Sequence, residues 1–211
     1  MPDLELDDAA VRWGGEPDGQ RVIVLLHGYG SDENDLFSLA RLLPTDYCYV
    51  AVRAPLDLPW PQPGASWYPI EGLTSRSAEG VNRGTAALLD WVDRALPTAT
   101  SIGLVGFSQG GAIALQALRT RPDAFAFVAN LSGYSTPGDL PGDEALAETK
   151  PPVFWGRGEL DEVIPSALVE HTTQWLPSHA NLVGRVYPFI GHSVSQEEFD
   201  DLGVFLAKQL G

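Results

Sequence analysis

Short apolar runs rich in β-branched residues alternate along the chain with longer segments whose apolar positions recur every three or four residues. The first pattern is typical of buried strands and the second of amphipathic helices. The predicted strands are 21–26, 47–53, 101–107, 125–131, 152–155 and 182–187. The predicted helices are 33–42, 80–96, 109–120, 165–175 and 196–210. This alternation predicts an α/β protein with a mostly parallel sheet and helices on both faces.

Two stretches between these elements, 54–79 and 133–152, are irregular and rich in proline or glycine. Both follow predicted strands, and ligands of open α/β sheets bind beyond the carboxyl ends of the strands. Neither is long enough to form a separate domain. We therefore expect one domain over residues 1–211 without a large cap. Ser31-Asp32 is expected to cap the first helix, and Ser195 with Glu198 forms a capping-box pattern for the last.

The chain has 211 residues, 44% of them hydrophobic, which suits a globular domain with a well-developed core. Its formal net charge of -15 argues against nucleic acid or an anionic membrane as partner, although the acidity also fits a salt-rich environment. No stretch has membrane-spanning length, and residues 1–13 lack the pattern of a signal peptide. A cytoplasmic protein without stable membrane association is expected.

Cys48 is the only cysteine, so no intrachain disulfide and no cysteine metal cluster can form. It lies in an apolar strand-like run, where we expect a buried, unreactive thiol. No cofactor or metal is predicted.

The strongest chemical signal is Gly106-Phe107-Ser108-Gln109-Gly110, between a predicted strand and a predicted helix. A strand, a serine on a sharp turn and a helix form the arrangement known as a nucleophile elbow. Side chains two residues before and after the serine would collide, and the glycines remove that collision. Gly111 then allows the helix to approach the strand closely.

A serine hydroxyl needs an adjacent base that is itself oriented by an acid, and in this layout the order is serine, acid, histidine. His192 follows the last predicted strand and precedes the last helix, so it is the expected base. His171 and His179 are interpreted as surface residues, and His27 precedes the serine. A loop or capping role for His192 is the alternative.

The acid is expected in the segment that follows the strand at 152–155, where Glu159, Asp161 and Glu162 compete. Asp161 is favoured because Val163, Ile164 and Pro165 place it just before a helix. The alternative is that Asp161 only caps that helix, which is a common task of aspartate. Glu159 and Glu162 are expected to be solvated.

Two backbone N–H groups are needed where negative charge develops on the substrate oxygen. Gln109 follows the serine at a helix N-terminus and supplies one of them. The turn His27-Gly28-Tyr29-Gly30 follows the first predicted strand, and the N–H of Tyr29 is the expected second donor. The side chain of His27 is expected to bond locally and shape this turn.

The stretch 54–79 carries aromatic residues among its prolines, including Trp60, Trp67 and Tyr68. These side chains are candidates for the wall of a substrate pocket. The alternative is that they close the end of the core.

Four motifs in order resemble the phospholipase/carboxylesterase family of small serine α/β-hydrolases, which includes the acyl-protein thioesterases. They are Leu25-Leu26-His27-Gly28-Tyr29-Gly30-Ser31-Asp32-Glu33-Asn34-Asp35-Leu36, Val105-Gly106-Phe107-Ser108-Gln109-Gly110-Gly111-Ala112, Gly158-x-x-Asp161-x-Val163-Ile164-Pro165 and Gly191-His192-Ser193. The resemblance implies a minimal α/β-hydrolase fold, with Ser108, Asp161 and His192 as catalytic residues and Tyr29 and Gln109 as oxyanion donors. It leaves open a monomer or a homodimer.

The chain departs from the family at two positions. Trp155-Gly156 stands where the family usually has His-Gly, and Tyr29 stands where leucine is common. The second change brings an aromatic ring near the mouth of the site, so the preferred acyl chain does not carry over from the family.

The sequence thus predicts a serine carboxylesterase that hydrolyses small esters with short to medium acyl chains through an acyl-enzyme on Ser108, with thioesters reacting by the same route. A lysophospholipase or acyl-protein thioesterase is the enzymatic alternative. A non-catalytic ligand-binding protein is the alternative from another class.

Overall fold

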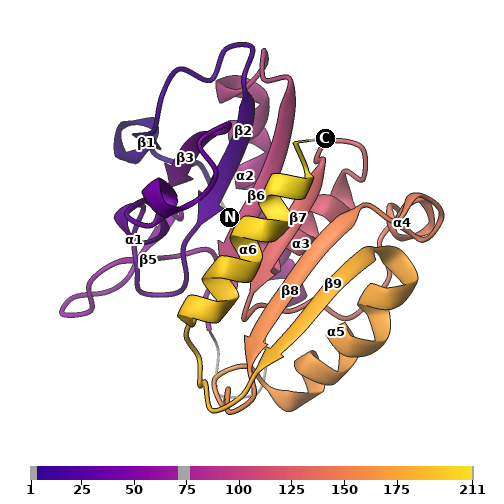
Figure 1. Ribbon diagram of the computed structural model, residues 1–211. Helices are drawn as coiled ribbons and strands as arrows, with labels where there is room; N and C mark the ends of the chain where they lie inside the picture. The colour runs from indigo at the N-terminus through magenta and orange to yellow at the C-terminus, as the bar shows by residue number, and fades with distance from the viewer. Residues whose placement is uncertain (1–3, 71–76, 211) are drawn as a thin grey trace.

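A seven-stranded sheet forms the centre of the molecule, in the strand order β1-β3-β2-β6-β7-β8-β9 (Figure 1). The computed structural model describes residues 4–70 and 77–210. All neighbouring strands run parallel except β1, which is antiparallel to β3. The strands are β1 (Arg12–Trp13), β2 (Arg21–Leu26), β3 (Cys48–Val52), β6 (Ser101–Phe107), β7 (Phe127–Leu131), β8 (Pro152–Gly158) and β9 (Asn181–Tyr187). A small hairpin of β4 (Leu56–Asp57) and β5 (Ala65–Ser66) protrudes from the body (Figure 1).

Helices cover both faces of the sheet, as predicted. One face carries α2 (Ala78–Ala95), α3 (Gln109–Thr120), α4 (Asp143–Thr149) and α5 (Ser166–His179), and the other carries α1 (Asn34–Phe37), the 3-10 turn η2 (Ala40–Leu42) and α6 (Gln196–Lys208). A further 3-10 turn, η1, spans Asp8–Ala10. Strand β2 shows why the run 22–26 is continuously apolar: Val22 and Val24 pack on the first face, whereas Ile23 and Leu25 pack on the second.

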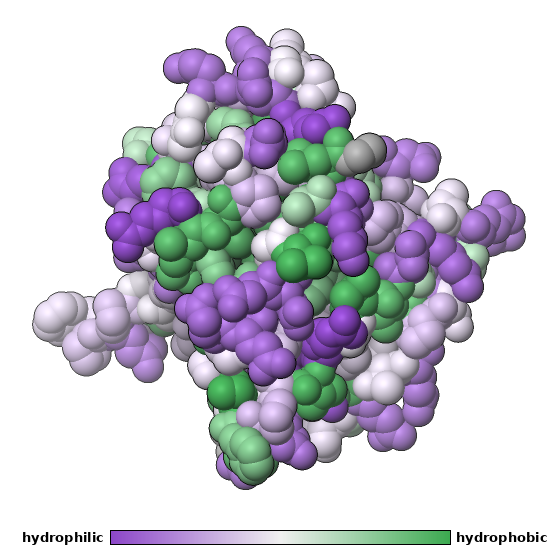
Figure 2. Space-filling model, in the orientation of Figure 1, coloured by the Kyte–Doolittle hydropathy of each residue, from purple (hydrophilic) through white to green (hydrophobic). Residues whose placement is uncertain are grey.

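On the face that carries α6, apolar side chains lie on both sides of a polar cluster (Figure 2). In the described part of the chain, no helix is both long enough and apolar enough to cross a bilayer.

The bounds of β2, β6 and α3 agree with the prediction, but the helix expected at 33–42 is broken. Helix α1 ends at Phe37, and η2 follows as a separate turn. The hydroxyl of Ser38 donates to the carbonyl of Asp35 at 2.7 Å, and Leu39 and Leu42 bond three residues back instead of four. Local side-chain bonding of this kind competes with regular helix. Asp32 caps the start, because its Oδ1 accepts from the N–H of Asn34 at 2.8 Å.

Other differences lie where the pattern was weak. The stretch 133–152 contains α4, and the stretch 54–79 contains the β4–β5 hairpin, although residues 71–76 of it lie outside the described residues. Helix α5 continues through Pro177 to His179. Strand β8 extends to Gly158 because it pairs with β9 along its whole length. The longer β8 places the segment that carries Asp161 directly after a buried strand.

The order of the strands places a ligand site between β2 and β6. The chain runs from β2 outward to β3 on one side, and later returns to β6 on the other side of β2. Strand connections diverge at such a switch point, and ligands bind beyond its carboxyl ends. Tyr29 and Ser108, on the turns that follow these two strands, therefore lie at the same edge.

Below this edge, Glu198 of α6 is completely buried against Gly156 of β8, a position where a side chain would collide with the carboxyl group. Its backbone N–H donates to Ser195 Oγ at 3.1 Å, which is the expected capping bond, but in the described structure neither carboxyl oxygen has a hydrogen-bond partner. Burial, with a further contribution from Asp201, raises the pKa of Glu198 to about 7.

We predict that Glu198→Gln removes part of the pH dependence of stability. Because the folded pKa lies above the unfolded one, the folded state binds the extra proton, and wild-type stability falls as pH rises from about 4.5 to about 7. The loss amounts to about 3 kcal/mol. Urea unfolding at pH 5 and pH 8 measures the free energy of unfolding of both proteins. Glu198→Gln should be more stable than the wild type at pH 8 but not at pH 5. The same pH dependence in both proteins would contradict the assignment.

Candidate active site

Ser108 lies on a sharp turn between β6 and α3, with φ 55° and ψ -113°. Residues other than glycine rarely adopt a positive φ, so this backbone is strained. A Cβ at Gly106 would collide with the carbonyl of Gly110, and one at Gly110 would collide with the carbonyl of Leu26. The two glycines thus permit the close crossing that the sequence predicted, and the turn is held by a bond from the N–H of Ser108 to Leu131 O at 2.8 Å.

Three side chains that are far apart in the sequence form one line of hydrogen bonds. His192 Nε2 lies 2.8 Å from Ser108 Oγ, and His192 Nδ1 lies 2.7 Å from Asp161 Oδ2. The side chain of Asp161 is 4% exposed and that of His192 is 15% exposed. A carboxylate at Nδ1 requires that this nitrogen carries a proton, which leaves Nε2 free to accept the serine proton.

The loops that carry Asp161 and His192 are bonded to each other. Asp161 Oδ1 accepts from the N–H groups of Val163 at 2.9 Å and Ile164 at 3.2 Å. Helix α5 begins later, with Pro165 at its cap, so Asp161 orients its own loop and does not cap that helix. The N–H of Leu160 donates to Ile190 O at 2.8 Å, which fixes this loop beside the loop of His192.

The other histidines and carboxylates predicted as competitors lie elsewhere. Glu159 and Glu162 are exposed, as expected. His171 and His179 both belong to α5 and are half-buried, so they are less exposed than freely solvated surface residues. His179 stacks on Trp175 at a ring distance of 4.1 Å, because helix α5 extends one turn further than predicted.

His27 shapes the turn after β2 through both of its ring nitrogens. Its Nδ1 lies 2.7 Å from the carbonyl oxygen of Gly28, and the N–H of Ala54 donates to its Nε2 at 3.0 Å. A carbonyl only accepts and an amide N–H only donates, so the ring is neutral with its proton on Nδ1. Burial lowers the pKa of His27, which favours this neutral form.

This bond also sets the direction of the N–H of Tyr29. A trans peptide is planar, with its C=O and N–H pointing in opposite directions. By fixing the carbonyl of Gly28, His27 fixes the plane of the peptide that contains the N–H of Tyr29. Gly28 lies against Phe107 and Ser108, so this peptide borders the serine. The second candidate donor, the N–H of Gln109, belongs to the first residue of α3.

The side chain of Gln109 ties the aromatic segment to the serine turn. Its Oε1 accepts from the N–H of Trp67 at 3.0 Å, and its Nε2 donates to Tyr68 O at 2.9 Å. The indole N–H of Trp67 donates to the carbonyl of His27 at 2.9 Å. These bonds join the turns after β2 and β6 with the segment that follows β5.

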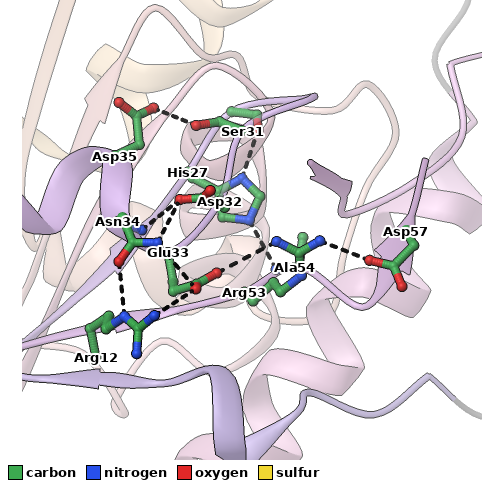
Figure 3. A network of polar contacts seen from close by, with 11 residues as sticks. Arg12, His27, Ser31, Asp32, Glu33, Asn34, Asp35, Arg53, Ala54 and Asp57 are labelled. Atoms are coloured by element: carbon green, nitrogen blue, oxygen red, sulfur yellow. Dashed lines mark hydrogen bonds and ion pairs between the residues drawn. The ribbon is translucent and has the colours of Figure 1, made fainter. Parts of the chain in front are cut away.

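A network of charged residues braces the same region from behind (Figure 3). Glu33, nearly buried, lies 3.4 Å from Arg12 and 3.6 Å from Arg53. Arg53 also pairs with Asp57 at 2.8 Å. The network therefore links β1, the segment after β2 and the end of β3, next to the residue whose N–H holds His27.

A pocket of about 200 Å³ opens in front of Ser108, and its lining is mostly apolar. Of the three aromatic residues predicted to line it, Tyr68 does so. Trp67 is completely buried in the core instead, because its indole is used to hold the turn of His27. Trp60 is 93% exposed in the connection between β4 and β5 and does not belong to the lining. The prediction that Trp60 and Trp67 line the pocket is therefore wrong.

Several pocket residues were missed by the sequence analysis. They include Ser31, Asp35, Ile70, Phe107 and Tyr134. Tyr134 follows Gly133 directly after β7, and its hydroxyl lies 2.7 Å from that of Tyr68. Its position after a parallel strand, in a stretch predicted to be irregular, could have indicated that it lines the site.

Cys48 is buried as expected, and burial raises the pKa of its thiol. In residues 4–70 and 77–210, no group of three or more His, Cys, Asp and Glu side chains is arranged to hold a metal ion.

Residues 6–210 match the Phospholipase/Carboxylesterase family, and the chain belongs to this family of α/β-hydrolases. Acyl-protein thioesterase 1 of Kluyveromyces lactis is 27% identical over 214 residues, which covers 90% of this chain and 92% of that protein. Acyl-protein thioesterase 1 of Saccharomyces cerevisiae is 34% identical over 109 residues, covering 50% of this chain and about half of the relative's length (48%). Among solved structures, esterase PE8 is similar with a TM-score of 0.76 and 26% identity, over 98% of this chain and 99% of that chain.

We predict that His27→Ala lowers kcat on a small aryl ester by about tenfold to a hundredfold, with KM changed by less than about threefold. The loss is smaller than that expected for removal of an oxyanion donor, because the N–H of Tyr29 remains but loses its fixed direction. His27→Asn keeps an N–H that can donate to Gly28 and should recover part of the rate. A variant His27→Ala with wild-type kcat would contradict this role.

Proposed function

We propose that the protein is a serine carboxylesterase that hydrolyses esters with short to medium acyl chains through an acyl-enzyme on Ser108. The observation that carries the proposal is the continuous line from Asp161 through His192 to the strained Ser108, at the base of a small pocket. Family membership supports an ester or thioester hydrolase in general.

The chemistry follows from the protonation states that the contacts require. His192 Nε2 takes the proton of Ser108 Oγ as the oxygen attacks the ester carbonyl. The negative oxygen of the tetrahedral intermediate faces the N–H groups of Tyr29 and Gln109. His192 returns the proton to the leaving alcohol, then activates water to release the acid. Asp161 holds the imidazole and stabilises its charged form. Thioesters react by the same route.

The size of the pocket supports small substrates. At about 30 Å³ per heavy group, a volume of about 200 Å³ holds six or seven such groups. Pockets for drug-sized ligands are larger, at about 300–1,000 Å³. The alternatives are an acyl-protein thioesterase, which the names of two relatives favour, and a lysophospholipase. Both functions require room for a long acyl chain.

We predict that Ser108→Ala abolishes turnover and prevents labelling by a fluorophosphonate, while circular dichroism stays that of the folded protein. The residue lost is the only nucleophile in the proposal, so residual activity should be at least a thousandfold below wild type. Ser193→Ala, one residue beyond the proposed base, is the matched control and should keep its label. Full labelling of Ser108→Ala would exclude Ser108 as the nucleophile.

A series of aryl esters of increasing acyl length, with one thioester of each length, separates the two enzymatic functions. We expect kcat/KM to be highest at about two to six acyl carbons and to fall beyond that as the pocket fills. A maximum at fourteen or sixteen carbons would instead support the long-chain thioesterase or lysophospholipase.

A further inference from the structure

The pocket in front of Ser108 has a distinctive combination of aromatic rings and one carboxylate. Its described lining includes the rings of Tyr29, Tyr68, Phe107 and Tyr134. Asp35 is the one acidic residue of this described lining, which contains no lysine or arginine. His192 is the proposed base. Tyr68 and Tyr134 are fully buried, so the pocket offers a substrate one negative group and the partly exposed rings of Tyr29 and Phe107.

Asp35 keeps its negative charge available, unlike its neighbour Glu33. Glu33 lies between two arginines, whereas the carboxylate of Asp35 accepts a bond from the hydroxyl of Ser31, which donates to its Oδ2 at 2.8 Å (Figure 3). Within the described residues, no lysine or arginine forms an ion pair with Asp35. Oδ1 thus retains its capacity to interact with a ligand.

Both features favour a positive group in the substrate. A carboxylate attracts a cation through Coulomb interaction and repels an anion by the same amount. Aromatic faces bind ammonium groups, so an accessible ring at the pocket adds to this attraction. Tyr29 contributes a ring that is 41% exposed at the mouth. The net charge of -15 adds a long-range field of the same sign.

We infer that the site prefers esters that carry a positive charge, such as an amine or a quaternary ammonium group, over anionic esters of the same size, and that Asp35 is the residue that determines this preference. This inference rests on the proposed function, because it assigns the substrate class of the same site. It makes no assumption about which side of the scissile bond carries the charge.

Two substrate series test it. In the first the charge is in the alcohol: acetylcholine, its uncharged carbon isostere, and an acetate ester whose alcohol bears a carboxylate. In the second the charge is in the acyl group: aryl esters of a short trimethylammonium-bearing acid, of its carbon isostere and of a carboxylate-bearing acid of equal length. The readout is the ratio of kcat/KM for the cationic ester to that for its neutral isostere. Because the ratio is internal to each protein, a general change in activity cancels.

The variant is Asp35→Asn, which is nearly isosteric and can still accept the bond from Ser31. The matched control is Asp123→Asn, which removes one exposed carboxylate beyond the far end of α3 from Ser108. That helix of 12 residues is about 18 Å long, more than a Debye length at physiological salt.

In the wild type we expect the ratio to be about fivefold or more in at least one series, and the anionic ester to be the poorest substrate. Asp35→Asn should lower that ratio by about threefold to tenfold, and Asp123→Asn should leave it unchanged. A wild-type ratio at or below one in both series, or the same ratio in Asp35→Asn, would overturn the inference while hydrolysis of the neutral esters upholds the proposed function. If the wild type hydrolyses no ester of either series, both the function and the inference fail.

Discussion

The strained backbone of Ser108 is the constraint on which the rest of the site depends. A φ of 55° at a serine costs on the order of 1–3 kcal/mol, so the surrounding structure must hold it. Strand β6 is paired on both sides, by β2 and β7, and α3 packs across both β6 and β7. Gly106 and Gly110 allow this crossing. The turn directs Oγ toward His192 and places Gln109 at the start of α3.

The loops around Ser108 are fixed by bonds to one another more than by their own secondary structure. His27 and the side chain of Gln109 join three segments: the turn after β2, the serine turn and residues 66–68. The loops that carry Asp161 and His192 are joined by the hydrogen bond from the N–H of Leu160 to the carbonyl of Ile190. Below them, Glu198 packs in the core without a hydrogen-bond partner in the described structure. Because the pKa of Glu198 is raised, the stability of this part of the core depends on pH.

Much of this arrangement was predictable from the sequence because buried parallel strands and glycine-dependent turns leave strong local patterns. Strands β2 and β6 are largely apolar, and the spacing of Gly106, Ser108 and Gly110 is explained by sterics. The order of Ser108, Asp161 and His192 then followed from the strands that each residue succeeds. The structure brings these three side chains together.

What the sequence did not reveal depends on side-chain orientation. Trp60, Trp67 and Tyr68 lie within nine positions of each other, yet Trp60 is exposed while Trp67 and Tyr68 are both fully buried. Of the three, Tyr68 alone also borders the pocket. Only the bonds of Trp67 to Gln109 and His27 decide its place. Asp35 lies within the predicted helix 33–42, and only the structure shows that it lines the same pocket as Ser108.

The central claim is that the acyl group passes through Ser108. Mass spectrometry of the protein, quenched during turnover of an aryl ester and digested, measures this directly. We predict that the peptide containing Ser108 gains the mass of the acyl group, and that this mass disappears when the substrate is consumed. Turnover without such an adduct, or an adduct on a different residue, would contradict the account.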